Sequence, residues 1–401
     1  MNAVGIDVSK GKSTIAVMRP FGEIVYSPFE VQHNETELKD LVKKLKSLKG
    51  ETRVVIEYTG NYYAPIANAL CEAGIYVSVI NAILIHDYKN NSLRRVKTDK
   101  KDAVKLANYA IDSWLELPRY YIEDEARVLL KNYYRQYEQY SKLHTMISNN
   151  LISLLDIAYP GVNKIFQSKT REDGHEKWVD FVHEFYHSDK VSSYSKSVFN
   201  KKYCSWCKKY GYRYLESKAN EIYSHAKQCV STIPNDEHSK ILIQTCASEL
   251  QLMNDTLYTI RSEMNNIAAT LPEYPIVMSM YGVGPTLGPQ LMAEIGNVRR
   301  FHSKKALIAY AGIDSPPYQS GDVNVKSRSM TKRGSSSLRR TLFIVMGIYL
   351  KNAPQDEPIY QYMVHKKLEG KHFKVYMMAS ANKFLRCYYA TVNNYLNSID
   401  N

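Results

Sequence analysis

The sequence predicts an α/β domain at the N-terminal end and a mostly helical remainder. Residues 1–115 alternate short β-type runs with helical patterns of apolar residues. Two long heptad patterns follow between residues 126 and 271, and each is typical of a long helix that buries one seam. Because strand and helix signals are segregated along the chain, the expected fold class is α/β plus α.

The N-terminal elements begin with three short strands in a meander. These strands are predicted over Ala3–Val8, Ser13–Met18 and Glu23–Ser27, with Gly and Pro turn residues between them. A helix, a strand, a helix, a strand and a helix are then predicted over Glu35–Leu48, Arg53–Glu57, Tyr62–Ala73, Ile75–Ile80 and from about Thr98 onward. This order of elements is that of a ribonuclease-H-like domain, which we assign to residues 1–117.

Two heptad seams, with alternating spacings of four and three, predict long coiled-coil helices that pack together within one chain or across a dimer. The first seam is Ala126, Leu130, Tyr133, Tyr137, Tyr140, His144, Ile147, Leu151 and Leu154. The second is Cys246, Leu250, Met253, Leu257, Ile260, Met264, Ile267 and Leu271. We assign residues 118–272 to this coiled-coil region, with an inserted helical segment over residues 160–234 that is rich in Lys and Tyr. Residues 273–401 form the C-terminal domain.

Charge and composition indicate a basic protein that binds a polyanion. The 401 residues include 53 Lys and Arg but 40 Asp and Glu, so the net charge is +13, which favours nucleic acid as a partner. With 44% apolar residues the chain has enough to build cores, which argues against a disordered protein. No apolar run reaches the roughly 18–20 residues that span a bilayer. The six Cys are scattered, so we expect a cytoplasmic, nucleoid-associated protein.

Four carboxylates stand at positions that suit a metal site. Asp7 lies within the apolar strand VGIDVSK, and Glu57 ends the run RVVIE. A carboxylate in an apolar strand is costly unless it is paired or binds a cation. Asp99 and Asp102 are three residues apart and therefore share one face of a helix. Together these oxygen ligands predict a site for one or two Mg²⁺ ions.

Lysines surround the last two carboxylates in the segment KTDKKDA. Lys97, Lys100 and Lys101 predict phosphate contacts beside the metal ligands. The alternative is an exposed helix face with local salt bridges, in which Asp99 is the N-cap and Asp102 pairs with a neighbouring lysine.

Two glycines of the C-terminal domain lie in the turn YGVGP. Gly282 and Gly284 resemble the turn of a helix-hairpin-helix module, in which backbone amides at a helix N-terminus bind phosphate. The alternative is an ordinary turn between two helices.

A basic stretch follows this turn. Residues 298–340 contain ten Lys and Arg but two Asp, which is a net charge of +8 in 43 residues. The candidate nucleic-acid contacts in it are Lys326, Arg328, Lys332, Arg333, Arg339 and Arg340. Ser320 lies in the loop just before most of them, and a serine becomes a nucleophile only beside a base or metal and phosphate-binding cations.

Four residues of the inserted segment have the chemistry of zinc ligands. Cys204 and Cys207 are joined by two residues, and His225 and Cys229 follow. The spacing is irregular for a zinc finger, so incidental cysteines on a helix are the preferred interpretation.

Several motifs together resemble the DEDD transposases of the insertion-sequence-110 family, which are bridge-RNA-guided recombinases of bacterial mobile elements. The motifs are GIDVSK, IEYTGNYY, KTDKKDA, YGVGP and SGDVNVKSRSMTKRGSSSLRR, and they cover roughly residues 1–157 and 230–350. The chain departs from the family pattern at Ala82 and at Thr331–Lys332. The resemblance implies a RuvC-like N-terminal domain with Asp7, Glu57, Asp99 and Asp102 as metal ligands. It also implies a coiled coil, and a C-terminal transposase domain in which Ser320 attacks the DNA phosphodiester.

We therefore expect an Mg²⁺-dependent recombinase that acts on donor and target DNA, is guided by a structured non-coding RNA, and works as a dimer or tetramer. Two alternatives stay open. One is a Holliday-junction resolvase that uses the same carboxylates and a water nucleophile. The other is a non-catalytic RNA-binding scaffold, although intact acids at all four positions argue against it.

Overall fold

The computed structural model describes residues 1–58, 60–88, 98–166, 171, 173–315, 319–320, 323–324 and 329–400. The chain divides into two compact units, Met1–Ile122 and Glu123–Asn401. The domain boundaries proposed from the sequence stay predictions. Within the described residues, no helix has the length and apolar character needed to cross a membrane.

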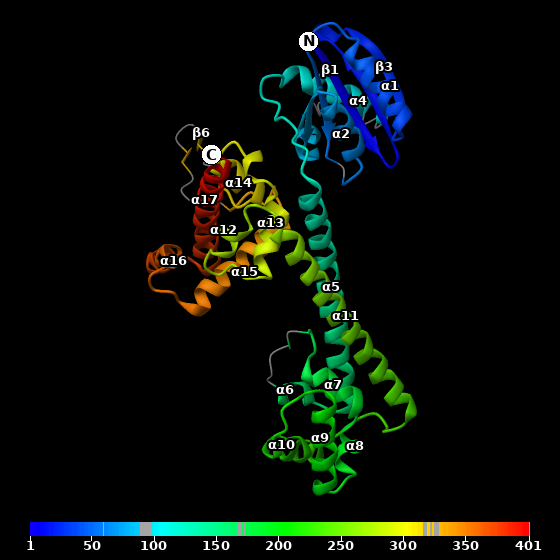
Figure 1. Cartoon of the computed structure of the whole chain (residues 1–401), viewed down its shortest axis with the longest axis vertical. Helices are drawn as coiled ribbons and strands as arrows, with labels where there is room; N and C mark the ends of the chain where they lie inside the picture. Colours follow the sequence, from blue (N-terminus) through cyan, green and yellow to red (C-terminus); the bar gives the residue numbers. More distant parts are fainter. Residues whose placement is uncertain are drawn as a thin grey trace. The chain divides into compact units, whose positions relative to one another are not determined.

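The first unit contains a five-stranded sheet with the strand order β3-β2-β1-β4-β5 (Figure 1). The strands are β1 (Asn2–Ser9), β2 (Lys12–Met18), β3 (Ile24–Gln32), β4 (Thr52–Glu57) and β5 (Tyr76–Ile80). β1, β2 and β3 pair antiparallel, whereas β4 pairs parallel with both β1 and β5. The predicted meander and the two strands predicted after it are confirmed.

Helices cover both faces of this sheet because successive strand residues point to opposite sides. On one face, Val4, Ile6, Val54 and Ile56 share a buried cluster with residues of α1 (Glu35–Lys46) and α2 (Ala64–Glu72). On the other face, buried residues of β1, β4 and β5 pack against α4 (Asp99–Asp112). The sequence did not predict two short helices, η1 (Pro20–Gly22) and α3 (Ala82–Asp87).

Two long helices dominate the second unit, α5 (Glu125–Ala158) and α11 (Glu237–Ala269). They pack against each other within one chain (Figure 1). Leu130 of α5 shares a buried cluster with Met264 of α11, and Leu151 shares another with Leu250, so the two helices are antiparallel. Coiled-coil supercoiling of the pair stays a prediction.

The segment between the long helices is helical. It contains α6 (Val162–Ile165), α7 (Lys177–Glu184), α8 (Ser188–Ser192), α9 (Lys196–Lys209) and α10 (Glu216–Gln228). Its core is aromatic: the Phe181 ring stands edge-on to Trp206, and Tyr203 stacks on Trp206. These rings bury the inner face of α9.

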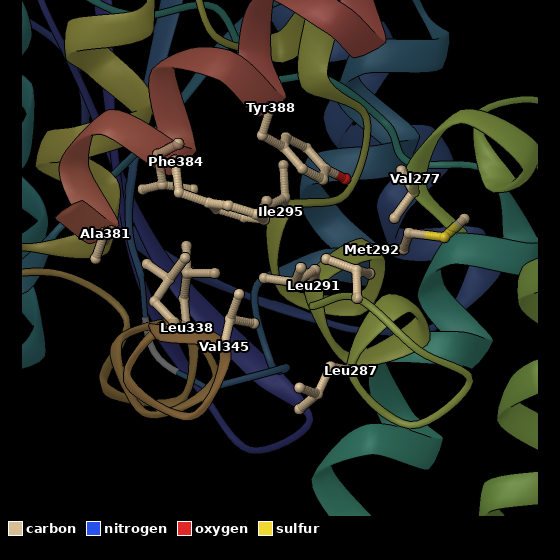
Figure 2. Packing of buried hydrophobic residues seen from close by; sticks show 14 of the residues in the cluster. Val277, Leu287, Leu291, Met292, Ile295, Leu338, Val345, Ala381, Phe384 and Tyr388 are labelled. Carbon is tan, nitrogen blue, oxygen red and sulfur yellow. The ribbon is translucent and has the colours of Figure 1, made fainter. Parts of the chain in front are cut away.

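The residues after α11 form helices and two short strands, and most of their buried residues share one hydrophobic core. Its elements are α12 (Tyr274–Met278), α13 (Leu287–Ile295), η2 (Val298–Arg300), α14 (Lys304–Ala311), β6 (Gln319–Ser320), β7 (Val323–Asn324), α15 (Ser336–Asn352), α16 (Pro358–Leu368) and α17 (Phe373–Asp400). Figure 2 shows Leu291 and Ile295 of α13 packed with Leu338 of α15 and Phe384 of α17. α17 has no counterpart among the sequence predictions.

Candidate active site and nucleic-acid interface

Asp7 and Glu57 lie at adjacent positions on two parallel strands. The β1–β4 register pairs Gly5 with Val55 and Ile6 with Ile56, so Asp7 and Glu57 are the next pair along. Neighbouring residues of paired strands point to the same face, and Val55 belongs to the cluster that packs on α4. Both carboxylates therefore face α4, and both are half-buried.

α4 crosses β1 directly over Gly5, with the helix backbone against the strand. A β-carbon on Gly5 would overlap the carbonyl oxygen of Ala103 and the amide nitrogen of Ala107, and it would lie 2.9 Å from the carbonyl carbon of Leu106. A glycine inside a strand often marks such an approach of another backbone. The absence of a side chain at Gly5 thus sets the position of α4 on the sheet.

The direction of α4 brings its first turn to the Asp7 end of the strands. Arg53, at the start of β4, donates to the carbonyl of Trp114, just beyond the end of α4, and its guanidinium lies 4.7 Å from the Trp114 ring centroid. Since α4 ends at the start of β1 and β4, it begins near their carboxyl ends. Asp102 is half-buried and Asp99 is exposed in this first turn, on the same side of the sheet as Asp7 and Glu57.

The start of α4 is capped by Thr98, whose hydroxyl accepts a hydrogen bond from the Lys101 amide at 3.3 Å. The alternative in which Asp99 is the N-cap is therefore wrong. Lys100 and Lys101 are exposed beside the two carboxylates. Lys97 lies outside the described residues.

The donor set suits a hard divalent cation, because all four candidate ligands are carboxylates. The side chains are not arranged as a complete metal site: in the described part of the chain, no group of three or more His, Cys, Asp or Glu side chains is close enough to hold a metal ion. Asp7, Glu57 and the first turn of α4 lie toward the same end of one sheet face, and the joint role of the four carboxylates as ligands stays a prediction.

Cys204, Cys207, His225 and Cys229 of the inserted segment likewise form no such group in the part of the chain that the structure describes. Cys204 and Cys207 are free thiols on α9, and burial raises the pKa of Cys207. His225 and Cys229 instead contact the carbonyl oxygen of Pro160, at 2.8 Å and 3.6 Å.

Ser320 belongs to the second unit, in the two-residue strand β6. Its backbone pairs with Val323 of β7. The Ser320 side chain, Lys326 and Arg328 lie outside the described residues. Lys332 and Arg333 are exposed. Lys332 has a left-handed backbone (φ 56°), and its amide donates to the Gly312 carbonyl at 3.0 Å, so the segment that carries Lys332 and Arg333 is fixed to the residue that follows α14.

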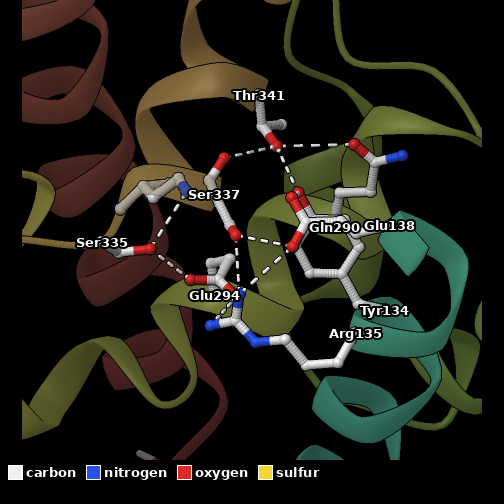
Figure 3. A network of polar contacts seen from close by, with 9 residues as sticks. Tyr134, Arg135, Glu138, Gln290, Glu294, Ser335, Ser337 and Thr341 are labelled. Carbon is white, nitrogen blue, oxygen red and sulfur yellow. Dashed lines mark hydrogen bonds and ion pairs between the residues drawn. The ribbon is translucent and has the colours of Figure 1, made fainter. Parts of the chain in front are cut away.

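A polar network around one buried carboxylate contacts Ser335, the residue at which the basic segment becomes helix (Figure 3). Ser335 caps α15, and its hydroxyl donates to the fully buried carboxylate of Glu294 on α13. Arg135 of α5 pairs with the same carboxylate at 2.8 Å and donates to Ser337 at 2.6 Å. The network thus connects α5, α13 and the start of α15 through the Glu294 carboxylate.

Arg339 and Arg340 have different surroundings. The Arg339 guanidinium donates to the carbonyl oxygens of Ala311 and Gly334, at 2.9 Å and 3.0 Å, whereas Arg340 is exposed. Gly282 has a φ of 74° in the turn between α12 and α13, with the Tyr349 ring packed against it. Gly284 is half-buried in the same turn. The helix-hairpin-helix role of this turn stays a prediction.

Two family models match separate regions of the chain. Residues 4–160 match a transposase model of the IS110 DEDD type, and residues 274–361 match a model described as transposase of the IS116/IS110/IS902 family. The chain belongs to the IS110 family of DEDD transposases. Family membership makes it an enzyme that acts on DNA.

Individual relatives of this IS110-family protein support the assignment. It is 20% identical to a 43.6 kDa protein of insertion element IS110 from Streptomyces coelicolor, over 85% of this chain and 82% of the relative. It is 22% identical to a pilin gene-inverting protein of Moraxella bovis, over 84% of this chain and 79% of the relative. The transposase of element IS1533 from Leptospira borgpetersenii is 32% identical over 28% of this chain and 31% of the relative.

Two features of the candidate site and its surroundings were not predicted from the sequence. The first is Gly5, although a glycine within an otherwise apolar strand is a readable signal of close backbone approach. The second is the Glu294–Ser335 contact. Its partners are 41 residues apart, and nothing in the local pattern links them.

Proposed function

We propose that this protein cuts and rejoins DNA by Mg²⁺-dependent phosphoryl transfer, with Ser320 as the nucleophile. The observation that carries the proposal is the packing of α4 on Gly5, because it sets the first-turn carboxylates of α4 over the sheet end that holds Asp7 and Glu57. Asp99 and Asp102 lie in the first turn of α4, and the same turn carries the exposed Lys100 and Lys101.

Each part of the chain has a distinct task in this proposal. Asp7, Glu57, Asp99 and Asp102 would hold one or two Mg²⁺ ions, which supply Lewis-acid activation of the scissile phosphate when bound. Ser320 attacks phosphorus: its Oγ–P bond forms, its proton leaves to a base, and the bond from phosphorus to the leaving deoxyribose oxygen breaks. Because the phosphoserine ester conserves the bond energy, a second hydroxyl can rejoin the strand.

The basic end of the serine loop supports the binding part of the proposal. Lys332 and Arg333 are exposed, and Lys326 and Arg328 precede them in the sequence. Cations of this kind bind phosphate and stabilise the charge of the transition state. We further propose that the partners are donor DNA, target DNA and a structured guide RNA, and that a homo-oligomer assembles the active site. These finer points rest on the family resemblance and on the net charge of +13.

The first experiment distinguishes a serine nucleophile from water. Wild type, Asp7→Asn and Ser320→Ala are incubated with labelled DNA, the guide RNA and Mg²⁺, then separated on denaturing gels. Wild type should give a protein–DNA adduct, and both variants should give none. Cleavage by Ser320→Ala at the wild-type rate, with no adduct from any variant, would instead identify a resolvase that uses water.

A second experiment tests metal dependence and subunit sharing. Excess chelator should abolish cleavage, and Mg²⁺ should raise the melting temperature of wild type but not that of Asp7→Asn, because a cation that binds the native state stabilises it. Mixing Asp7→Asn with Ser320→Ala should restore part of the activity if the carboxylates and the serine come from different subunits. Full activity in chelator would refute the metal role.

A further inference from the structure

The inserted helical segment lies outside both regions that the family models match. The family models end at residue 160 and resume at residue 274, so helices α6 to α10 fall between them. The segment is nevertheless well built, with a buried aromatic core and close packing on α11 through α7.

Its most charged element is α9, whose sequence KSVFNKKYCSWCKK has five lysines and no acidic residue. All five lysines are exposed. At about 100° per residue, Lys201, Lys202, Lys208 and Lys209 lie within about 120° of the helix circumference. The opposite side, formed by Phe199, Tyr203 and Trp206, is buried in the aromatic core and fixes the orientation of the lysine face.

Two aromatic rings hold lysines of this face in place. The Lys202 ammonium lies 4.9 Å from the Tyr194 ring centroid, and that of Lys209 lies 5.0 Å from the Tyr210 centroid. Contacts of this kind restrict a long side chain but leave its charge unneutralised. Considering the described residues alone, no ion pair within 4.0 Å joins any of the four ammonium groups to a carboxylate.

The lysines also surround a hollow of about 420 Å³ at the edge of the face. Lys190, Lys201, Lys202 and Lys209 line it together with Ser205 and one carboxylate, Glu184. Lys190 donates to the Glu184 carbonyl oxygen at 2.8 Å, and burial lowers its pKa. Four cations around one anion make this hollow electropositive, which suits a phosphate group.

The chemistry of the face points to a phosphate backbone. The pairs Lys201–Lys202 and Lys208–Lys209 are seven residues apart, or about 10 Å along the helix. Because a DNA duplex carries one charge per roughly 1.7 Å of axis, both pairs can meet phosphates of the same duplex. Lysine acts as a point charge and lacks the planar fork with which arginine reads a base edge. Tyr194 and Tyr210 lie against ammonium groups, whereas a single-strand site needs aromatic rings free to stack on bases.

We propose that the lysine face of α9 binds the phosphate backbone of duplex DNA without regard to sequence, outside the segment where strands are exchanged. The choice of DNA rests on the proposed recombinase function, because the DNA substrate extends as a duplex on both sides of any cleavage point. The module would thereby increase the affinity of the enzyme for flanking DNA and contribute nothing to the choice of target.

The test is a salt titration of full-length protein on a scrambled 30-base-pair DNA duplex, measured by fluorescence anisotropy. Replacing Lys201, Lys202, Lys208 and Lys209 with Gln should flatten the slope of log K against log salt by up to about 3.6. A control with the same charge change replaces Lys39, Lys43, Lys46 and Lys49 of the first unit, and it should keep the wild-type slope. Unchanged melting temperatures will show that both variants fold, because all the altered side chains are exposed.

Two results would overturn the proposal. One is an unchanged slope in the α9 variant. The other is a loss of affinity for structured RNA while duplex DNA affinity keeps its wild-type value, because the face would then serve RNA. Neither readout depends on cleavage, so a failure of the proposed catalytic function, seen as wild-type activity in Asp7→Asn, is distinguishable from a failure here.

Discussion

Gly5 and Ala103 are in direct backbone contact, because α4 lies so close to β1 that no β-carbon fits at Gly5. The contact involves main-chain atoms of the helix, which cannot rotate away as a flexible side chain would. The position of the Asp99–Asp102 turn relative to Asp7 and Glu57 therefore depends on one missing methyl group.

Replacing Gly5 with Ala should push α4 off the sheet. Overpacking of this kind costs about 1–3 kcal/mol of stability, and DNA cleavage should fall further than stability does because the carboxylates separate. Calorimetry and a cleavage assay on the same preparation measure the two effects. Gly347→Ala in α15 is the matched control, since a β-carbon there has open space and alanine favours a helix by about 1 kcal/mol. Wild-type stability in Gly5→Ala would show that α4 can shift freely.

The ion pair between Arg127 and Glu273 gives a second prediction. Both side chains are buried, and the Arg127 guanidinium donates to both carboxylate oxygens of Glu273, at 2.6 Å and 2.5 Å. Burial by itself lowers the pKa of Arg127, but the carboxylates of Glu273 and Asp124 more than offset it, so that pKa is raised. Glu273→Ala should cost up to about 3–5 kcal/mol in denaturant unfolding, because the buried Arg127 guanidinium loses one of its two carboxylate partners and keeps Asp124 alone. Arg127→Met with Glu273→Leu should cost less than the single change, and a larger loss would contradict this account.

The strands could be predicted from the sequence because each carries its own apolar pattern. The exception is β3, which contains Pro28 and continues to Gln32, whereas the strand predicted from the sequence ended at Ser27. β3 is the edge strand, and the register shifts between Tyr26 and Phe29. Proline is tolerated at such an edge bulge because it interrupts no ladder hydrogen bond.

The candidate site was only partly predictable, for a different reason. Strand alternation places Asp7 and Glu57, but their proximity to Asp102 depends on how a helix some 45 residues further along docks on Gly5. The α9 lysines are visible in the sequence, yet their common exposed face depends on Phe199 and Trp206 being buried by other helices. Tertiary packing, which one sequence does not encode locally, decides both.

Ser335 should couple the stability of the C-terminal core to the serine loop. Ser335→Ala removes the N-cap bond to the Leu338 amide (3.1 Å) and one donor to buried Glu294. We expect a loss of about 1–3 kcal/mol, and slower adduct formation because the end of the basic stretch is less well fixed. Ser335→Thr keeps the hydroxyl and should restore most of both. Equal losses in the two variants would exclude the hydroxyl as the cause.

Glu176 should make stability depend on pH. Burial by itself raises the pKa of this carboxyl, but hydrogen bonds from His144, Trp178 and Asn254 outweigh burial, so the pKa lies below its usual 4.5. The unfolded chain binds the proton more tightly, so this stabilisation is complete above about pH 5 and is lost as the pH falls through the folded-state pKa. Glu176→Gln should reduce the change of the unfolding free energy with pH between about pH 5 and 3. Trp178→Phe, which removes the 2.8 Å hydrogen bond to Glu176, should have a smaller effect. An unchanged pH profile in Glu176→Gln would remove Glu176 as its source.

Arg339 and Arg340 form a natural test of structure against binding, because they are sequence neighbours with different contacts. Arg339→Gln loses two bonds to the backbone carbonyls of Ala311 and Gly334, so it should destabilise the protein by about 1–3 kcal/mol. Arg340→Gln changes an exposed side chain and should leave the melting temperature within about 1 °C, since surface substitutions away from special features cost little.

If Arg340 contacts phosphate, its loss should reduce the slope of log K against log salt by about 0.9. Arg339→Gln, measured where it is fully folded, should keep more of the wild-type slope, because part of its guanidinium is already bound within the domain. The reverse pattern, with Arg340→Gln unstable and the Arg339 variant weak in binding, would show that the contacts described for these two side chains do not exist in solution.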